Sequence, residues 1–333
     1  MQHIHVPHLQ SRQSGLTMVE LLVAMAISTV IAIAAISALI VSRRGFTAVD
    51  ASSQLRDNAR FAIDLLQRLG VQTGYEDVQY AATVRPVNNV KVAANPAPNI
   101  FGFNNAAVSS SDPLNSSVAR PTGSVDGSDV LILRYQAGET FPGSATSDKT
   151  MIDCAGYPAA SIPADLDDRM VSILDVGTGV DGEPSLRCTY LGSSGTYTTQ
   201  PIVQGVENFQ VLYGVDKVTA NTAPTAATNS VADSYLRADQ MAVAGNSVAT
   251  NANWRRVRSL RIGMVLRGPL GSAQDKTAQT FYPFGQAKSS SSGAIGSAMS
   301  SSSDTGTVFS PGADGRLRQT VTFTVYLRNE QGL

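Results

Sequence analysis

The stretch QSGLTMVELLVAMAISTVIAIAAISALIVSRRG, from Gln13 to Gly45, decides the fold of the N-terminal part of the chain. It contains no charged residue between Leu21 and Val41. A helix of that length measures roughly 30 Å, which is enough to cross a bilayer. Glu20 directly precedes this apolar run. Because a charge beside such a run is unfavourable without a partner, Glu20 requires an explanation.

Three kinds of export signal compete for this region. A conventional signal peptide could be cut after Ala32-Ile33-Ala34, but only one fixed positive charge, Arg12, precedes the apolar run. A permanent anchor conflicts with Arg43 and Arg44, which follow the run and would be expected on the cytoplasmic side. The third interpretation places the cleavage before the apolar run, after Gly15.

The residues GLTMVELLVAMA, 15–26, resemble the type IV prepilin signal. In that family a peptidase cuts after a glycine and methylates the new amine. Gly15, Leu16 and Glu20 match the glycine, the apolar first residue and the glutamate at the fifth position; the family usually has phenylalanine where Leu16 stands. The resemblance implies a leader over residues 1–15 and a methylated amine on Leu16.

Two interpretations explain Glu20. In a helical filament, its carboxylate can meet the Leu16 amine of a neighbouring subunit, and this pairing would set the register of packing because each buried charge needs its partner. Alternatively, the segment Thr17–Glu20 fits a capping box, which satisfies the first backbone groups of a helix. The capping box accounts for a helix start but not for the membrane-length run that follows, so the filament interpretation is favoured.

Beyond Gly45 the helix pattern becomes amphipathic. Apolar residues at spacings of three and four form a stripe on one side, consisting of Leu55, Ala59, Ala62, Leu66 and Leu69. Gly70 is predicted to end the helix, and Gly45 permits a bend because glycine weakens a helix interior by about 1 kcal/mol. One helix over residues 17–69 would span roughly 80 Å.

Strand patterns dominate from Val71 onward. They cover residues 130–135, 170–174, 186–190, 209–213, 257–266 and 320–328. In the last of these, Val321, Phe323, Val325 and Leu327 share one side. The sequence therefore predicts an α+β fold, in which the amphipathic helix covers an antiparallel sheet.

Three long segments interrupt these strands: 81–128, 216–253 and the low-complexity 286–306. A short helix is expected around 234–241.

The head segments resemble the PilW group of minor pilins. The matching stretches are GVENFQVLYGVD (205–216), SYLRADQM (234–241), WRRVRSLRIGMVLRG (254–268) and TVYLRN (324–329). The resemblance implies a pilin-like fold and a non-catalytic minor pilin that helps initiate type IV pilus assembly in the fibre tip complex. Pili of this kind serve cell adhesion and twitching motility. The J subunit of type II secretion, a pseudopilin, is the nearest alternative.

Histidine and cysteine usage narrows the chemistry. The three histidines, His3, His5 and His8, all precede Gly15, so the processed chain would lack a Ser-His-Asp triad or a histidine zinc site. The two cysteines, Cys154 and Cys188, are expected to form a disulfide rather than remain separate buried thiols, because the chain is membrane-directed. A periplasmic enzyme without histidine is the alternative from another class, and no active site for it is found.

Two kinds of charged cluster, one of arginines and one of aspartates, are candidates for binding sites. Five arginines lie between Arg255 and Arg267, but strand alternation divides them between two faces and only Trp254 is aromatic nearby, so nucleic acid is not expected. The aspartate-rich segments 126–129, 165–168 and 181–183 match no calcium loop and are typical of turns. No metal and no cofactor are expected.

The sequence thus predicts three parts: a leader over residues 1–15, a helix over 16–70 with its membrane or filament-core segment at 21–41, and a β-rich head over 71–333. The expected partners are other minor pilins, the major pilin, the prepilin peptidase and a tip adhesin. The prepilin is expected in the inner membrane as a single-pass protein with its head facing the periplasm, and later in the extracellular pilus.

Overall fold

The computed structural model describes residues 15–77, 95–115, 127–273, 275–285, 307–329 and 331. The expected leader, apart from Gly15, and the segment 286–306 fall outside these residues, as does most of 81–128. The chain divides into two compact units, residues 1–49 and 50–333.

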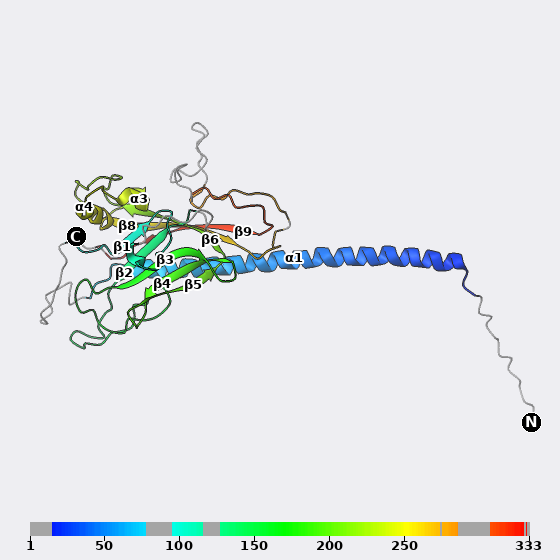
Figure 1. Ribbon diagram of the computed structural model, residues 1–333, viewed down its shortest axis with the longest axis horizontal. Coiled ribbons are helices and arrows are strands. Elements are labelled where there is room, and N and C mark those ends of the chain that lie inside the picture. The colour runs from blue at the N-terminus through cyan, green and yellow to red at the C-terminus, as the bar shows by residue number, and fades with distance from the viewer. Residues whose placement is uncertain are drawn as a thin grey trace, which may run out of the picture. The chain divides into compact units, whose positions relative to one another are not determined.

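The first unit is the N-terminal part of helix α1, which runs from Met18 to Gln72 (Figure 1). Every residue from 15 to 44 is exposed. Three hydroxyl groups in this part bond back to the helix: Ser28 Oγ donates to the carbonyl oxygen of Ala24 at 2.7 Å, and Thr29 and Ser37 do the same toward Ala26 and Ile33, both at 2.8 Å. These three hydroxyl groups therefore have hydrogen-bond partners within the helix, although they lie on its apolar surface.

In the second unit, residues 50–72 of α1 bury one side. The buried apolar residues there are Ala51, Leu55, Ala59, Ala62, Leu66 and Leu69. The predicted stripe is therefore confirmed at all five of its positions. Its period of three and four residues places these side chains on one face, in the same hydrophobic core as the strands, which is how an amphipathic helix covers a sheet.

The end of α1 corrects one prediction. Gly70 does not end the helix, which continues to Gln72. Gly70 instead lies within the last turns against Val325, and an added Cβ would collide with that side chain. The turn after the helix contains Gly74 at a φ of 73°, the left-handed conformation that glycine adopts most readily.

The strands of the second unit form two antiparallel sheets. The first has the order β1 (Ile100–Phe103), β2 (Val130–Tyr135), β3 (Met170–Thr178), β4 (Pro184–Leu191) and β5 (Tyr197–Gln204). The second has the order β7 (Ser234–Leu236), β6 (Val206–Val215), β8 (Val257–Arg267) and β9 (Arg318–Tyr326). A 3₁₀ turn, η1 (Pro113–Asn115), and helices α3 (Ala238–Met241) and α4 (Ser247–Trp254) lie in the connections.

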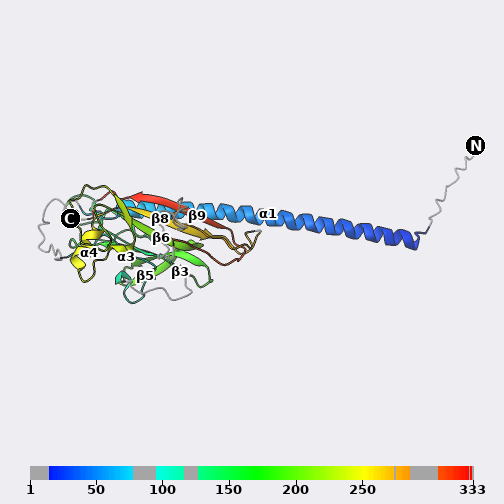
Figure 2. The same ribbon diagram turned by 90° about the horizontal axis from the view of Figure 1, so that it is seen from above.

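The two sheets meet at β6, which packs against β3 and β4. Figure 2 shows β9, β8 and β6 in succession, with β3 and β5 of the first sheet beyond them. The indole of Trp254 fills the core here, with ring centroids 4.8 Å from Phe101 and 4.7 Å from Tyr213. These aromatic contacts join both sheets to α4.

The prediction of an antiparallel β-rich head is confirmed, but it missed three strands and the division into two sheets. All six predicted strands are present as β2, β3, β4, β6, β8 and β9. The prediction of one sheet is corrected to two, and β1, β5 and β7 were not predicted. The segment 216–253, expected as a long insertion, contains β7, α3 and α4; the helix expected at 234–241 is confined to α3. On β9, Val325 is buried, and Val321 and Phe323 pack partly buried against the core.

Candidate functional site

The residues predicted for processing are accessible. Gly15 has no atom within 4 Å of the place where a Cβ would stand. Leu16 has 79% of its surface exposed, and the helix begins two residues later at Met18. The peptide bond after Gly15 therefore lies in an open, non-helical segment immediately before α1, as a peptidase substrate requires.

Glu20 makes the local capping box. Its Oε2 accepts hydrogen bonds from the backbone N–H of Thr17 at 2.9 Å and from the Thr17 hydroxyl at 3.0 Å. The backbone N–H of Glu20 donates in return to the Thr17 hydroxyl at 3.3 Å. Both carboxylate contacts use the same oxygen and are exposed. The pairing with a neighbour's amine involves a second subunit, so it stays a prediction.

Among the described residues, α1 is the one helix long and apolar enough to cross a membrane. None of the 18-residue apolar window in α1 is buried by other described parts of the chain. Large apolar side chains such as Leu21, Ile31 and Val41 are each more than half exposed. Such a surface is unstable in water, so it needs lipid or other apolar helices around it.

The structure joins Cys154 to Cys188 by a disulfide, with Cα atoms 5.7 Å apart. Both cysteines are buried, and the bond ties the loop before β3 to the middle of β4. Next to it, the Tyr135 hydroxyl bonds to the carbonyl oxygen of Ile152 at 2.6 Å and to Ser172 Oγ at 2.9 Å. Burial raises the pKa of Tyr135, so this hydroxyl stays protonated.

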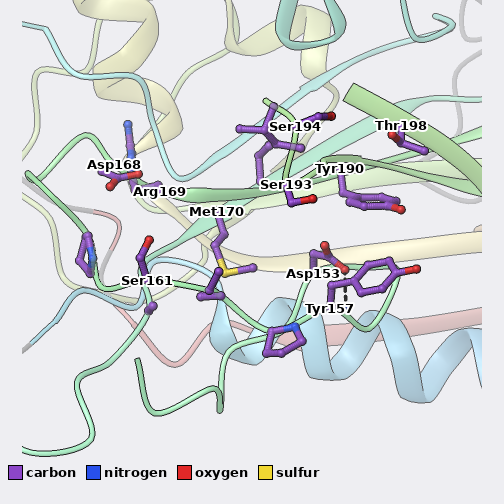
Figure 3. Close-up of a pocket in the computed structure, with 18 residues that line it drawn as sticks. Asp153, Tyr157, Ser161, Asp168, Arg169, Met170, Tyr190, Ser193, Ser194 and Thr198 are labelled. Carbon is purple, nitrogen blue, oxygen red and sulfur yellow. Dashed lines mark hydrogen bonds between the residues drawn. The ribbon is translucent and has the colours of Figure 1, made fainter. Parts of the chain in front are cut away.

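A cleft of about 620 Å³ opens beside the disulfide (Figure 3). Tyr157 and Tyr190 lie at one end, Asp168 and Arg169 at the other, and Met170 lies between them. The sequence reasoning missed this cleft because its walls come from Ala137 and from three further segments, 153–163, 168–171 and 190–198. One signal was available: each tyrosine follows a cysteine of the disulfide within three residues.

The arginines between Arg255 and Arg267 act as structural ties. Arg255 donates to the carbonyl oxygen of Pro96 at 2.6 Å, and Arg256 donates to that of Ala226 at 2.8 Å. Arg258 lies 3.9 Å from the buried carboxylate of Asp216. These contacts tie loops to β8 and to the residues that precede it.

A larger ionic network joins the two sheets. Arg267 bridges Glu183 at 3.0 Å, in the turn before β4, and Glu207 at 3.1 Å on β6. Arg316 also bonds to Glu183, at 2.8 Å, and Arg318 joins Glu207 and Asp314, both at 2.7 Å. Because three arginines alternate with three carboxylates, the network is neutral and its members satisfy one another.

The network lowers the pKa of two of its carboxyl groups. Burial raises the pKa of Glu183, but the hydrogen bonds from Arg316 and Arg267 outweigh it and the net shift is downward. The hydrogen bonds from Arg318 lower the pKa of Asp314. Both groups are therefore ionised at neutral pH.

The aspartates weighed as metal ligands support turns instead. Asp129 accepts the backbone N–H of Asn105 at 2.9 Å and that of Val211 at 2.8 Å. Asp165 and Asp181 accept backbone N–H groups of residues two or three positions later. Asp126 lies outside the described residues. Within the ranges that the structure describes, no group of three or more potential ligands is arranged around a metal site.

Comparisons with known proteins place these features in a family. The family model of the type IV pilus-assembly protein W matches residues 173–329, and the model of the prokaryotic N-terminal methylation motif matches residues 10–36. No curated protein matches the chain. Among solved structures, a type IV-like pilin from Thermus thermophilus is similar at 14% identity and a TM-score of 0.38, covering 84% of this chain and 98% of that one.

The family models agree with the residues that carried the resemblance. The methylation motif contains Gly15, Leu16 and Glu20, and the PilW match contains all four of the head stretches. The long N-terminal helix and the antiparallel sheets are the α+β elements that the sequence predicted. The PilW match on the head and the methylation motif on the N-terminal segment together support a PilW-family type IV minor pilin.

Proposed function

We propose that this chain is a non-catalytic minor pilin that helps initiate type IV pilus assembly and lies in the tip complex of the fibre. The observation that carries the proposal is the combination of two family matches on one chain. A methylation motif directly precedes an exposed apolar helix, and the PilW match covers much of the head. A chain built in this way can be held in a membrane first and transferred to a helical bundle afterwards.

The proposed route begins at the inner membrane. The prepilin peptidase would cut after Gly15 and methylate the amine of Leu16, while the apolar segment 21–41 holds the chain in the bilayer and the head faces the periplasm. The open peptide after Gly15 supports this order, because the peptidase needs an unfolded bond next to the membrane. The extracellular pilus is the proposed destination.

In the assembled fibre, Glu20 would pair with the Leu16 amine of a neighbouring subunit and so set the register. An amine and a carboxylate that both leave water need each other, which makes the pair selective for one axial position. The partners proposed are other minor pilins, the major pilin and a tip adhesin. The PilW match on the head supports a pilus role over that of a type II secretion pseudopilin.

The N-terminal residue and the intact mass of the protein recovered from membranes test this proposal. We expect a chain that begins at Leu16 and carries one methyl group. A Gly15→Val variant should keep the full-length mass, because the peptidase requires the small residue. A wild-type chain that begins near Ala35, without the apolar run, would contradict the proposal and indicate an ordinary signal peptide.

A further inference from the structure

The cleft beside the disulfide has no part in processing or helix packing, and its construction indicates a binding site. Its volume of about 620 Å³ falls within the range of about 300–1,000 Å³ that small-ligand sites occupy. It lies wholly within the unit formed by residues 50–333. The cleft is therefore large enough for one or two sugar-sized rings.

The wall that carries Tyr157 is held in place before any ligand arrives. The disulfide fixes Cys154, whose backbone N–H also donates to Ser172 Oγ at 3.0 Å. Asp153, 4% exposed, accepts the backbone N–H groups of Ala155 at 2.8 Å and Tyr157 at 2.9 Å. A preorganised wall loses little conformational entropy on binding, which favours affinity.

The aromatic end of the cleft presents a flat apolar surface next to polar groups. The rings of Tyr157 and Tyr190 pack together with centroids 5.3 Å apart, inclined by 36°. Tyr157 nevertheless keeps 55% of its surface exposed. An exposed aromatic face with a hydroxyl at its edge combines apolar contact with hydrogen bonding.

The remaining lining supplies many short polar groups. Hydroxyls of Ser161, Ser193, Ser194 and Thr198 line the cleft, together with the Asp168 carboxylate (Figure 3). The guanidinium of Arg169, also in the lining, donates to the carbonyl oxygen of Ala97 and to Asn99 Oδ1, both at 2.7 Å, so the hydroxyls and the carboxylate are the polar groups left for a ligand. A ligand that matches them must carry several hydroxyl groups around an apolar ring face.

A saccharide has this chemistry, since its ring C–H groups lie against aromatic faces while its hydroxyls bond to polar side chains. We propose that the cleft binds a neutral saccharide, with Tyr157 and Tyr190 as the stacking platform and the hydroxyl-rich wall as the hydrogen-bonding side. Acidic sugars are disfavoured because Asp153 and Asp168 outnumber Arg169 among the charged residues of the lining.

An extended peptide fits this cleft less well. β4, which carries Tyr190, is hydrogen-bonded to β3 on one side and to β5 on the other. Its backbone therefore cannot take an added strand, which is how an extended peptide commonly binds a sheet. The edge strand β5 contributes one residue, Thr198, to the lining. Small side chains such as Ala137, Ala159 and Ala160 line the cleft without forming a deep apolar pocket for a peptide anchor.

The test uses the full chain in lauryldimethylamine oxide micelles, a detergent without a sugar head group. Maltotriose, cellotriose, globotriose and triacetylchitotriose are titrated by calorimetry and examined by saturation-transfer NMR; the last resembles cell-wall glycan and the third a host-surface glycan, so the panel separates the two sources. We expect at least one neutral trisaccharide to bind, with saturation strongest on its ring C–H groups. 3′-Sialyllactose should bind at least tenfold more weakly.

Variants assign the binding to the cleft. Tyr157→Leu and Tyr190→Leu should each weaken the best trisaccharide at least tenfold while the melting temperature stays near that of the wild type. Tyr326→Leu is the matched control, because Tyr326 is 75% exposed on β9 and is no part of the cleft lining. If either leucine variant unfolds, Thr198→Val provides a milder change and should weaken binding about threefold.

Three results would overturn the proposal. These are the failure of all four neutral trisaccharides to bind, binding that persists unchanged in the tyrosine variants, and Tyr157-dependent capture of casein tryptic peptides in place of sugars. None of these results bears on the processing of Gly15 or on incorporation into pili, so failure here is separable from failure of the assembly role.

Discussion

Glu20 is the residue at which two physical explanations can be separated. It caps α1 through Thr17 in the single chain, and it is proposed to bind a neighbour's amine in the fibre. We expect Glu20→Ala to leave membrane insertion intact and to reduce recovery in sheared pili at least tenfold. The reason is that an unpaired buried charge costs about 3–5 kcal/mol, and about 1.4 kcal/mol already corresponds to a factor of ten.

Thr17→Ala is the control for this prediction. It removes the capping hydroxyl, at a cost of about 1 kcal/mol to the helix start, but keeps the Glu20 carboxylate for a neighbouring subunit. Its recovery in pili should therefore stay near that of the wild type. Equal losses in the two variants would mean that Glu20 serves only as a cap.

The assembly motif could be predicted because its residues are contiguous. Gly15, Leu16 and Glu20 lie within six positions of one another, so the spacing alone carries the signal. The cleft could not be predicted, since Tyr157 precedes β3 and Tyr190 lies on β4, and the fold of the first sheet and the disulfide bring the two rings together. A motif of neighbouring residues can be recognised in the sequence, whereas a site assembled by tertiary contacts cannot.

At the scale of elements, the close approach of α1 to β9 depends on Gly70. A methyl group there would collide with Val325, so Gly70→Ala should destabilise the head by about 1–3 kcal/mol although alanine is the better helix former. The melting temperature of the full chain in detergent measures this effect, which we expect as a decrease.

Gly45→Ala is the matched control in the same helix. No atom lies within 4 Å of the added Cβ at Gly45, so only the helix propensity changes. Its melting temperature should stay equal or rise slightly, because alanine favours a helix interior by up to about 1 kcal/mol over glycine. A decrease for Gly45→Ala as large as that for Gly70→Ala would rule out the contact with Val325 as the cause.

Some helices and strands could be predicted from the sequence, and others could not. The buried stripe on α1 could be predicted because its apolar residues recur at spacings of three and four, which fit a helix and not the two-residue period of a strand. β5 was missed because it is an edge strand with polar residues and because Pro201 lies beside an irregularity in the pairing, where Ile202 of β5 has no partner residue in β4. The helix end was misplaced because Gly70 serves packing against Val325, which the sequence does not distinguish from a helix stop.

At the scale of the whole second unit, the ionic network makes stability depend on pH. The folded state lowers the pKa of Glu183 from 4.5 and that of Asp314 from 3.8. Their stabilisation is therefore present above the ordinary values and is lost as the pH falls through the lowered folded values. We expect the melting temperature of the head to hold above about pH 5 and to fall steadily below about pH 4.

Glu183→Gln tests the assignment of this acid sensitivity. Glutamine keeps the side-chain shape but cannot ionise, so its ion pairs with Arg267 and Arg316 are absent at every pH. The variant should melt lower than the wild type at neutral pH, and the difference should shrink in acid. A difference that is constant across the titration would show that charge at Glu183 contributes nothing.

The two sheets also follow one another along the chain. All strands of the first sheet lie between residues 100 and 204, and all strands of the second between 206 and 326. The disulfide lies wholly within the earlier group, 34 residues apart in sequence. If the head is translocated in the order of its sequence, behind an apolar segment that stays in the bilayer, its cysteines can be oxidised and the first sheet assembled on the far side while the second is still being translocated. The order of translocation and the order of folding would then be the same, and the disulfide could form before the C-terminal part of the head has been translocated.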